Sequence, residues 1–163
     1  MPNPNPDSQA SIISASPVDR INQGVLIHSV GYCCLQAYLE IVPNIKKQLS
    51  TLRLRPVEYT VLSLINNNPH INQKRLGQAI RVSPPNMATL LDKMQSDGLI
   101  DRRRNPNDRR SQILALTPKG LEICIEAEQI AIEADLTPTL SHAEREQLTR
   151  LLAKIFQSET DNG

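Results

Sequence analysis

A segment with the pattern of a β-hairpin carries five arginines within nine residues, and this feature constrains the fold more than any other. The segment, GLIDRRRNPNDRRSQILALTPKG, spans 98–120. Residues 99–103 and 112–116 have the pattern of two short strands, and 104–111 has the polar, proline-containing composition of a connecting loop. A charge run is most often a solvated turn. This one directly follows two helix patterns, the second with a polar, proline-capped face, which favours a binding function.

Four helical segments are predicted before the hairpin and two after it. The first covers about 19–52, and we expect Pro43 to kink or interrupt it. The second begins at Pro56 and ends within 66–69, and the third follows Asn72 as its N-cap. The expected buried side of the third helix consists of the apolar residues Leu76, Ala79, Ile80 and Val82.

The fourth helix has the clearest end signals. Ser83 suits the N-cap, Pro84 suits the first helical position, and Gly98 ends the helix. Helical spacing places four apolar side chains on its inner side: Met87, Leu90, Leu91 and Met94. The outer side is then formed by Ser83, Pro84, Pro85, Asn86, Thr89 and Lys93. The two later helices start after Thr117 and after Ser141, where Glu144 completes a capping box.

This order of elements predicts a mainly α fold with a small β-hairpin wing, the winged helix-turn-helix. In that fold the fourth helix lies in the DNA major groove, where short polar side chains reach base edges and phosphates. The hairpin reaches the adjacent minor groove, whose negative potential attracts arginine, and flanking arginines pair with phosphates. The arginines expected to contact DNA are Arg102, Arg104, Arg109 and Arg110.

The distribution of charge supports a polyanionic partner although the net charge does not. The whole chain has a formal net charge of +1 at pH 7. Residues 73–110 carry a net +5, residues 111–163 a net −5, and residues 1–72 a net +1. One face of the molecule is therefore expected to be basic and suited to double-stranded DNA.

The segment from Pro56 to Gly120 resembles the MarR family of bacterial transcriptional regulators. The resemblance rests on an Asp-Arg-Arg motif in the wing, Asp108–Arg110, followed by a Leu-Thr-x-x-Gly motif at Leu116–Gly120. It implies that Arg110 enters the minor groove and that Asp108 orients the neighbouring arginines by ion pairing. The recognition helix departs from the family pattern, because Pro84, Pro85, Ala88 and Thr89 stand where many members carry Ser, Thr and Arg.

The same resemblance implies a homodimer joined through the first and the last two helices. Residues 1–17 are rich in Pro, Asn and Ser and predict a flexible tail. The resemblance divides the rest of the chain into a helical dimerisation region (18–55 and 118–158) and a winged helix-turn-helix (56–117). The last helix has an apolar stripe suited to this interface, formed by Leu148, Leu151, Leu152, Ile155 and Phe156. A symmetric dimer implies a pseudo-palindromic operator.

Most members of this family bind a small aromatic or phenolic acid between the dimerisation helices and the DNA-binding lobe. The resemblance thus implies a repressor that its ligand releases from the operator. The candidate lining residues combine aromatic rings with cationic or polar groups: His28, Tyr32, Tyr38, Arg53 and Tyr59. For each of them taken singly, an ordinary core or surface role is the simpler interpretation.

Cysteines provide an alternative function on the same scaffold, a thiol-based sensor of oxidants. Cys33 and Cys34 lie in the first helix beside Tyr32, as in some MarR-type peroxide sensors. Adjacent helical residues diverge by about 100°, so a disulfide between them would strain the helix. We interpret both, and Cys124, as core residues in the first instance.

Other function classes find little support. The sequence has no motif of a hydrolase or of a phosphate-binding loop, and its three histidines have no metal-ligand spacing, so we expect neither an enzyme nor a cofactor or metal. It also lacks a signal peptide and a run of about 18 apolar residues, which predicts a cytoplasmic protein without membrane spans. A DNA-binding protein that does not switch, with an architectural role, remains the second alternative.

Overall fold

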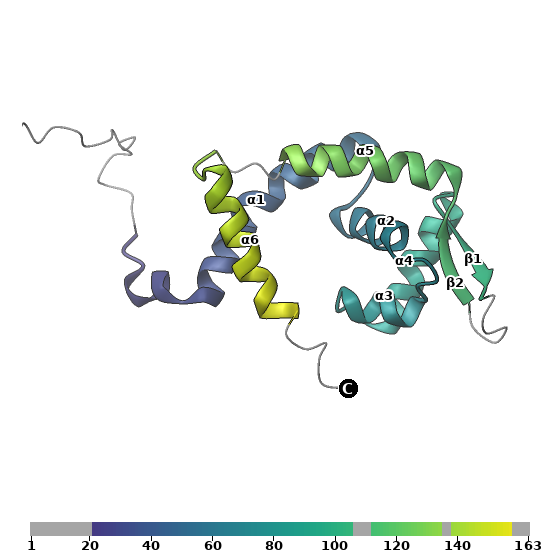
Figure 1. Cartoon of the computed structure of the whole chain (residues 1–163), viewed down its shortest axis with the longest axis horizontal. Helices are drawn as coiled ribbons and strands as arrows, with labels where there is room; N and C mark the ends of the chain where they lie inside the picture. Colours follow the sequence, from purple (N-terminus) through teal and green to yellow (C-terminus); the bar gives the residue numbers. More distant parts are fainter. Residues whose placement is uncertain (1–20, 106–111, 135–137, 158–163) are drawn as a thin grey trace, which may run out of the picture. The chain divides into compact units, whose positions relative to one another are not determined.

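The computed structural model describes residues 21–105, 112–134 and 138–157, and its elements follow the predicted order (Figure 1). The chain divides into two compact units, one ending at Gln36 and one beginning at Ala37. The elements are η1 (Gly24–His28), α1 (Val30–Leu49), η2 (Ser50–Leu52), α2 (Pro56–Asn67), α3 (Gln73–Ala79), α4 (Pro84–Ser96), β1 (Ile100–Arg104), β2 (Gln112–Leu116), α5 (Pro118–Ala134) and α6 (His142–Gln157).

The predicted helix boundaries of the second unit are confirmed by their capping groups. Pro56 and Pro84 each occupy the first turn of a helix. The Asn72 side chain accepts a hydrogen bond from the Arg75 N–H at 2.9 Å. The Ser141 N–H donates to the Glu144 carboxylate at 2.8 Å, as the capping box requires. These local signals position the helices before any long-range contact is considered.

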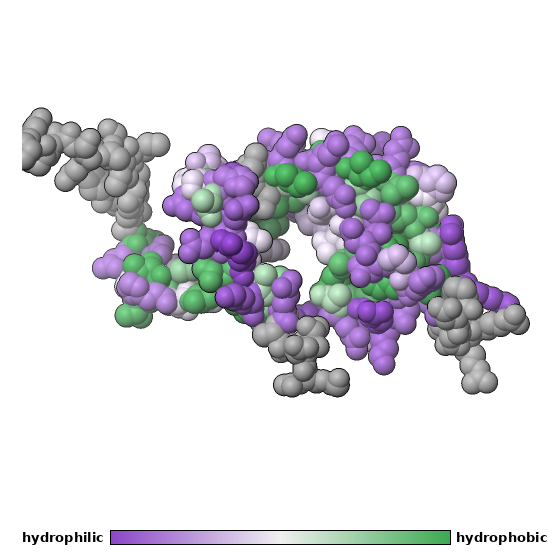
Figure 2. Space-filling model, viewed as in Figure 1, coloured by the Kyte–Doolittle hydropathy of each residue, from purple (hydrophilic) through white to green (hydrophobic). Residues whose placement is uncertain are grey.

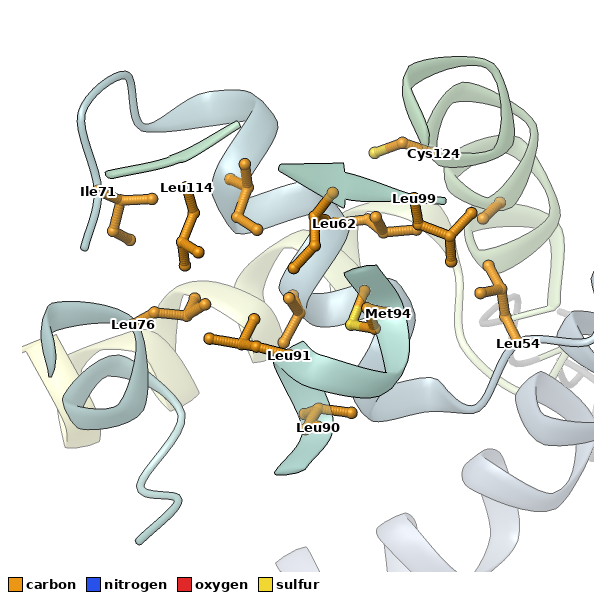
Figure 3. Packing of buried hydrophobic residues seen from close by; sticks show 14 of the residues in the cluster. Leu54, Leu62, Ile71, Leu76, Leu90, Leu91, Met94, Leu99, Leu114 and Cys124 are labelled. Carbon is orange, nitrogen blue, oxygen red and sulfur yellow. The ribbon is translucent and has the colours of Figure 1, made fainter. Parts of the chain in front are cut away.

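The core of the second unit forms where α2, α3, α4, α5 and the hairpin meet (Figure 3). All four residues predicted on the inner side of α4 are buried there: Met87, Leu90, Leu91 and Met94. Figure 3 shows Leu91 next to Leu76 of α3, and Met94 and Leu62 of α2 belong to the same cluster of buried residues. Because four buried side chains fix the rotation of α4 about its axis, its opposite side faces outward.

The wing is a two-stranded antiparallel sheet in which Ile100 lies opposite Leu116 and Arg104 opposite Gln112. β1 begins one residue later than predicted. Burial does not alternate along β2, because the adjacent residues Ile113 and Leu114 are both buried. The Leu114 N–H donates to the Ile71 carbonyl at 2.9 Å, so β2 is covered from the α2–α3 connection as well as by β1.

Two further expectations are corrected. α1 is continuous from Val30 to Leu49 with Pro43 inside it, so Pro43 does not interrupt the helix, although its ring removes one backbone hydrogen bond. α3 ends at Ala79, whose side chain is exposed, while Ile80 and Val82 are half-buried. Helical spacing could not place these last residues, because the chain leaves the helix immediately after Ala79.

Large apolar side chains remain exposed at both ends of the chain. On η1 and α1 they are Val25, Leu26, Ile27, Val30, Leu35, Tyr38 and Leu39, and on α6 they are Leu148, Leu151, Ile155 and Phe156. Figure 2 shows hydrophobic residues at the surface where η1 and the start of α1 lie. Leu152, the remaining member of the predicted stripe, is half-buried. Apolar surface of this extent is typical of an interface.

Candidate nucleic-acid interface and effector cavity

The outer side of α4 presents all the residues predicted to face DNA. Ser83, Pro84, Pro85, Asn86, Thr89 and Lys93 are exposed. The Thr89 hydroxyl donates to the Pro85 carbonyl at 3.1 Å, which leaves its oxygen lone pairs as acceptors. The first turn thus offers two prolines flanked by short polar groups, an arrangement that allows close approach to a groove.

Lys93 differs from the other five residues because two carboxylates hold its ammonium group. The Lys93 Nζ lies 3.0 Å from Glu58 Oε1 and 2.9 Å from Asp97 Oδ2. Hydrogen bonds to Asp97 and then to Glu58 raise the pKa of Lys93. In this structure Lys93 therefore ties α4 to α2.

Glu58 is a buried charged residue of α2, with 1% of its surface exposed. The Arg55 N–H donates to it at 2.8 Å and the Arg55 guanidinium at 2.9 Å. Burial raises the pKa of Glu58, but the hydrogen bonds from Arg55 and Lys93 outweigh burial, so the pKa lies below its ordinary value. Glu58 is consequently a carboxylate near neutral pH and joins the start of α2 to α4.

The described part of the wing contains Arg102, Arg103 and Arg104. The Arg102 guanidinium donates to Asp92 Oδ1 and Gln95 Oε1, both at 2.6 Å, and so fastens β1 to α4. Arg104 is exposed and has no ion-pair partner among the described residues. Asp108, Arg109 and Arg110 lie outside the described residues.

Arg81, between α3 and α4, is a basic residue that the sequence analysis did not single out. Its backbone adopts a left-handed conformation with φ of +53°, which L residues other than Asn and Asp rarely adopt. It lines a groove of about 850 Å³ together with Lys74, Ser83 and Pro84. Glycine would adopt this backbone conformation with less strain than arginine. We therefore expect the Arg81 side chain to have a function at this site.

The Leu-Thr-x-x-Gly motif has a structural explanation at the junction of the wing and α5. The Thr117 Oγ1 accepts from the Gly120 N–H at 2.9 Å and donates to the Gly98 carbonyl at 2.7 Å. A Cβ added at Gly120 would overlap the carbonyl oxygen of Leu99. The motif therefore brings the start of α5 against the chain that enters β1.

Of the five candidate ligand-binding residues, the structure brings Arg53 into a cavity. That cavity has a volume of about 510 Å³ and also contacts Glu58, Lys93 and Lys119. Tyr59 packs against the core, and Tyr38 is 60% exposed. His28, which is exposed, and Tyr32, which is half-buried, belong to the unit that ends at Gln36.

The three cysteines differ in environment. Cys33 is exposed and Cys34 half-buried, so their interpretation as core residues is wrong within a single chain, because the described residues up to Gln36 contain no buried side chain. Cys124 is fully buried, as predicted, and burial raises the pKa of its thiol to about 11. Its thiol is therefore protonated at neutral pH and a poor nucleophile.

Within residues 21–105, 112–134 and 138–157, no cluster of three or more His, Cys, Asp or Glu side chains is arranged to hold a metal ion. The described helices also include none with the length and apolar character needed to cross a bilayer.

Comparison with known proteins connects this geometry to one family. The model of the MarR family matches residues 54–112. A putative transcriptional regulatory protein for the hcr operon of Thauera aromatica is 31% identical over 114 residues, which is 69% of this chain and 69% of that protein.

Solved structures agree with this match. The transcriptional repressor CouR bound to a 23-mer DNA duplex has a TM-score of 0.75 and 32% identity, covering 83% of this chain and 98% of that one. CouR bound to p-coumaroyl-CoA has a TM-score of 0.71 and 29% identity, covering 83% of this chain and 97% of that one.

Proposed function

The chain belongs to the MarR family of transcriptional regulators, and from that premise we propose that it is a homodimeric repressor released from its operator by a small aromatic effector. One observation carries the DNA-binding part of this proposal. The polar first turn of α4 faces outward on a helix whose rotation is fixed by four buried side chains. The relatives are transcriptional regulators, which supports our proposal that the protein acts by binding DNA in the cytoplasm and not by catalysis.

The proposed DNA contacts fall into two groups. Ser83, Asn86 and Thr89 reach base edges or phosphates in the major groove, next to the exposed prolines. The proposed contacts from the wing are made by Arg104, Arg109 and Arg110. Arg110 enters the minor groove, and Asp108 orients the neighbouring arginines. Lys93 and Arg102 act mainly by holding α4, because carboxylates already occupy their charged groups.

The dimer is proposed to form through the apolar surfaces of α1 and α6, within the regions 18–55 and 118–158. Support comes from the exposed side chains on both helices, which have no covering partner among the described residues. Burying such surface stabilises association by about 25 cal/mol per Å² before the entropic costs of binding are counted. Residues 56–117 then form the DNA-reading part of each subunit.

The effector is proposed to be an aromatic acid or its coenzyme A thioester, because CouR has been solved with p-coumaroyl-CoA. We expect p-coumaroyl-CoA, or another member of a panel of aromatic acids and thioesters, to raise the melting temperature. At a concentration 100-fold above its dissociation constant, the compound raises the free energy of unfolding by about 2.7 kcal/mol. Because coupling between sites is reciprocal, the same compound weakens operator binding in a fluorescence-anisotropy titration. A compound that stabilises the protein without changing operator affinity would show that its site does not regulate.

A thiol-based sensor is the second candidate, and the exposure of Cys33 favours it. The Cys33 thiol donates to the Ile27 carbonyl at 3.2 Å, and oxidation would remove this contact with the end of η1. Peroxide treatment followed by mass spectrometry of Cys33 and Cys34 separates the candidates. Oxidation of Cys33 with loss of operator binding supports the sensor, whereas operator binding that survives oxidation supports the small-molecule effector.

Arg81 is proposed to contact a DNA phosphate. We expect Arg81→Gly to stabilise the fold by about 1 kcal/mol, because glycine adopts the left-handed conformation without steric cost. The same change should weaken operator binding and lower the slope of log K against log salt by about one unit for each subunit. Arg81→Lys keeps both the charge and the backbone cost, and serves as the control. Fluorescence anisotropy at several salt concentrations measures this slope. If Arg81→Gly leaves the slope of log K against log salt unchanged, Arg81 does not contact a phosphate.

A further inference from the structure

The bonds that α4 makes within the protein limit which of its side chains can bind DNA. Asp92 and Gln95 both accept hydrogen bonds from the Arg102 guanidinium, and two carboxylates hold the Lys93 ammonium group. The charged and long polar side chains in the second half of the helix are therefore occupied. Residues near the start of a helix in the major groove make most of its contacts with base edges. Base recognition by α4 thus depends on residues 83–89.

The side chains exposed in this stretch are all uncharged. They are Ser83, Pro84, Pro85, Asn86 and Thr89. Guanine is most often read by Arg or Lys, which donate hydrogen bonds to its O6 and N7 atoms. Arg81 lies before the helix, where we propose that it contacts a phosphate. The first two turns of α4 therefore lack the type of side chain that is best suited to guanine.

Two prolines change what the start of α4 offers to DNA. A helix usually begins with free backbone N–H groups, which bind anions such as phosphate. Pro84 and Pro85 occupy the first two helical positions and have no N–H. The Met87 N–H, two residues later, donates to the Ser83 carbonyl at 2.9 Å. The start of α4 therefore presents two exposed apolar rings where other helices present N–H groups.

An apolar surface at this position matches one feature of the major groove. Thymine carries a methyl group there, and apolar side chains recognise it by contact. The apolar surface is not confined to the two rings, because Pro84 and the half-buried Val82 both line the groove of about 850 Å³ between α3 and α4. Contact with thymine removes the methyl group and a proline ring from water together.

Asn86 supplies the polar part of the same turn. Its side chain is exposed, and its amide has no hydrogen-bond partner among the described residues. A carboxamide pairs with adenine through two hydrogen bonds, because its NH₂ donates to N7 and its oxygen accepts from the N6 amino group. The Thr89 hydroxyl already donates to the Pro85 carbonyl, so toward DNA it is an acceptor and does not suit the acceptor atoms of guanine.

We propose that α4 reads A·T base pairs, with Asn86 bound to an adenine and the rings of Pro84 and Pro85 packed against thymine methyl groups. The inference rests on the proposed function, because it names base pairs that the operator of this repressor contains. The three residues are consecutive, so the adenine and the thymines belong to the same base pair or to neighbouring ones.

Base analogues test the two kinds of contact separately. The starting duplex is the sequence that the full chain enriches from random DNA, and fluorescence anisotropy measures its affinity. Uracil in place of thymine removes the methyl group, and 7-deazaadenine in place of adenine removes N7, both in the major groove. In one half-site we expect uracil to weaken binding about fourfold for each contacted methyl group. We expect 7-deazaadenine to weaken binding about tenfold at one adenine. Affinity that responds to neither analogue at any position overturns the proposal.

Variants of α4 assign each effect to a residue. Pro84→Ser combined with Pro85→Ser removes both rings and keeps the backbone carbonyl that Thr89 binds, so uracil should no longer weaken binding. Asn86→Ala should weaken binding of the unmodified duplex about tenfold and should abolish the effect of 7-deazaadenine.

Ser96→Ala is the matched control for these variants. Ser96 is exposed in the last turn of α4, about 15 Å along the helix axis from Asn86. This variant should respond to both analogues as the wild type does, and melting temperatures verify that every variant is folded. Analogue effects that persist unchanged in the folded proline and Asn86 variants overturn the assignment.

Failure of this inference is distinguishable from failure of the proposed function. A chain that enriches no DNA sequence contradicts the proposed function and this inference with it. An enriched operator in which the α4 variants alter recognition of G·C base pairs alone overturns this inference and leaves the repressor function standing.

Discussion

Gly120→Ala is expected to destabilise the protein by about 3 kcal/mol or more. The added Cβ would overlap the Leu99 carbonyl oxygen and lie 2.8 Å from its carbonyl carbon. Both atoms belong to the backbone, so no side-chain rotation relieves the contact, and overpacking of this kind costs at the upper end of the usual range or above it. The Thr117 N–H donates to the same Leu99 carbonyl at 3.1 Å, so any displacement also weakens the anchor between the wing and α5.

Thermal unfolding at a fixed protein concentration measures this effect, and a loss of about 3 kcal/mol corresponds to roughly 10 °C. Gly31→Ala in α1 is the matched control, because an added Cβ there meets no atom within 4 Å. Helix propensity alone should make that control neutral or stabilising by up to about 1 kcal/mol. Equal melting temperatures for Gly120→Ala and Gly31→Ala would show that the close approach at Leu99 does not exist.

The DNA-binding part of the fold could be predicted from the sequence because its signals are local. Pro56, Asn72, Pro84 and Ser141 mark helix starts through backbone and capping chemistry that involves only neighbouring residues. The inner side of α4 follows from helical spacing alone. These features are sufficient to place the outer side of α4, which contains the candidate DNA-contacting residues.

Contacts between distant segments could not be predicted in the same way. One of the two carboxylates that bind Lys93 belongs to Glu58, 35 residues earlier, and Arg102 donates hydrogen bonds to residues of α4. Both were therefore assigned to DNA when the sequence was considered alone. The close approach of Gly120 to Leu99 and the strained backbone of Arg81 also depend on how elements pack.

The N-terminal segment shows a different reason for error. Its cysteines were interpreted as core residues because cysteine is often buried, and a sequence does not show whether an apolar residue is buried within one chain or between two chains. The described residues up to Gln36 are all exposed or half-buried. Their apolar pattern is accounted for by the proposed dimer.

Leu151→Asp combined with Ile155→Asp is expected to convert the dimer to monomers and to weaken operator binding by at least about 100-fold. The two side chains are 52% and 60% exposed, so their replacement leaves the packing of a single chain intact. In a dimer, binding of one DNA-binding region holds the second at a high effective concentration near its half-site. A monomer loses this advantage. Sedimentation measures the association state and fluorescence anisotropy the affinity.

Arg150→Asp is the control for this pair of substitutions. It lies on the polar side of α6 and changes the net charge by the same two units. The control should remain dimeric and keep its operator affinity to within a few-fold. A doubly substituted protein that stays a soluble dimer would exclude the proposed interface.

Selection from a random pool of DNA duplexes tests most directly whether the chain is a dimeric, sequence-specific reader of DNA. The wild-type protein should enrich a pseudo-palindrome whose half-sites are about 10 bp apart, centre to centre, or a multiple of that distance. The Leu151→Asp and Ile155→Asp protein should not enrich the paired sequence. Enrichment by the wild type of a single unrepeated half-site, or of no sequence at all, would contradict the account.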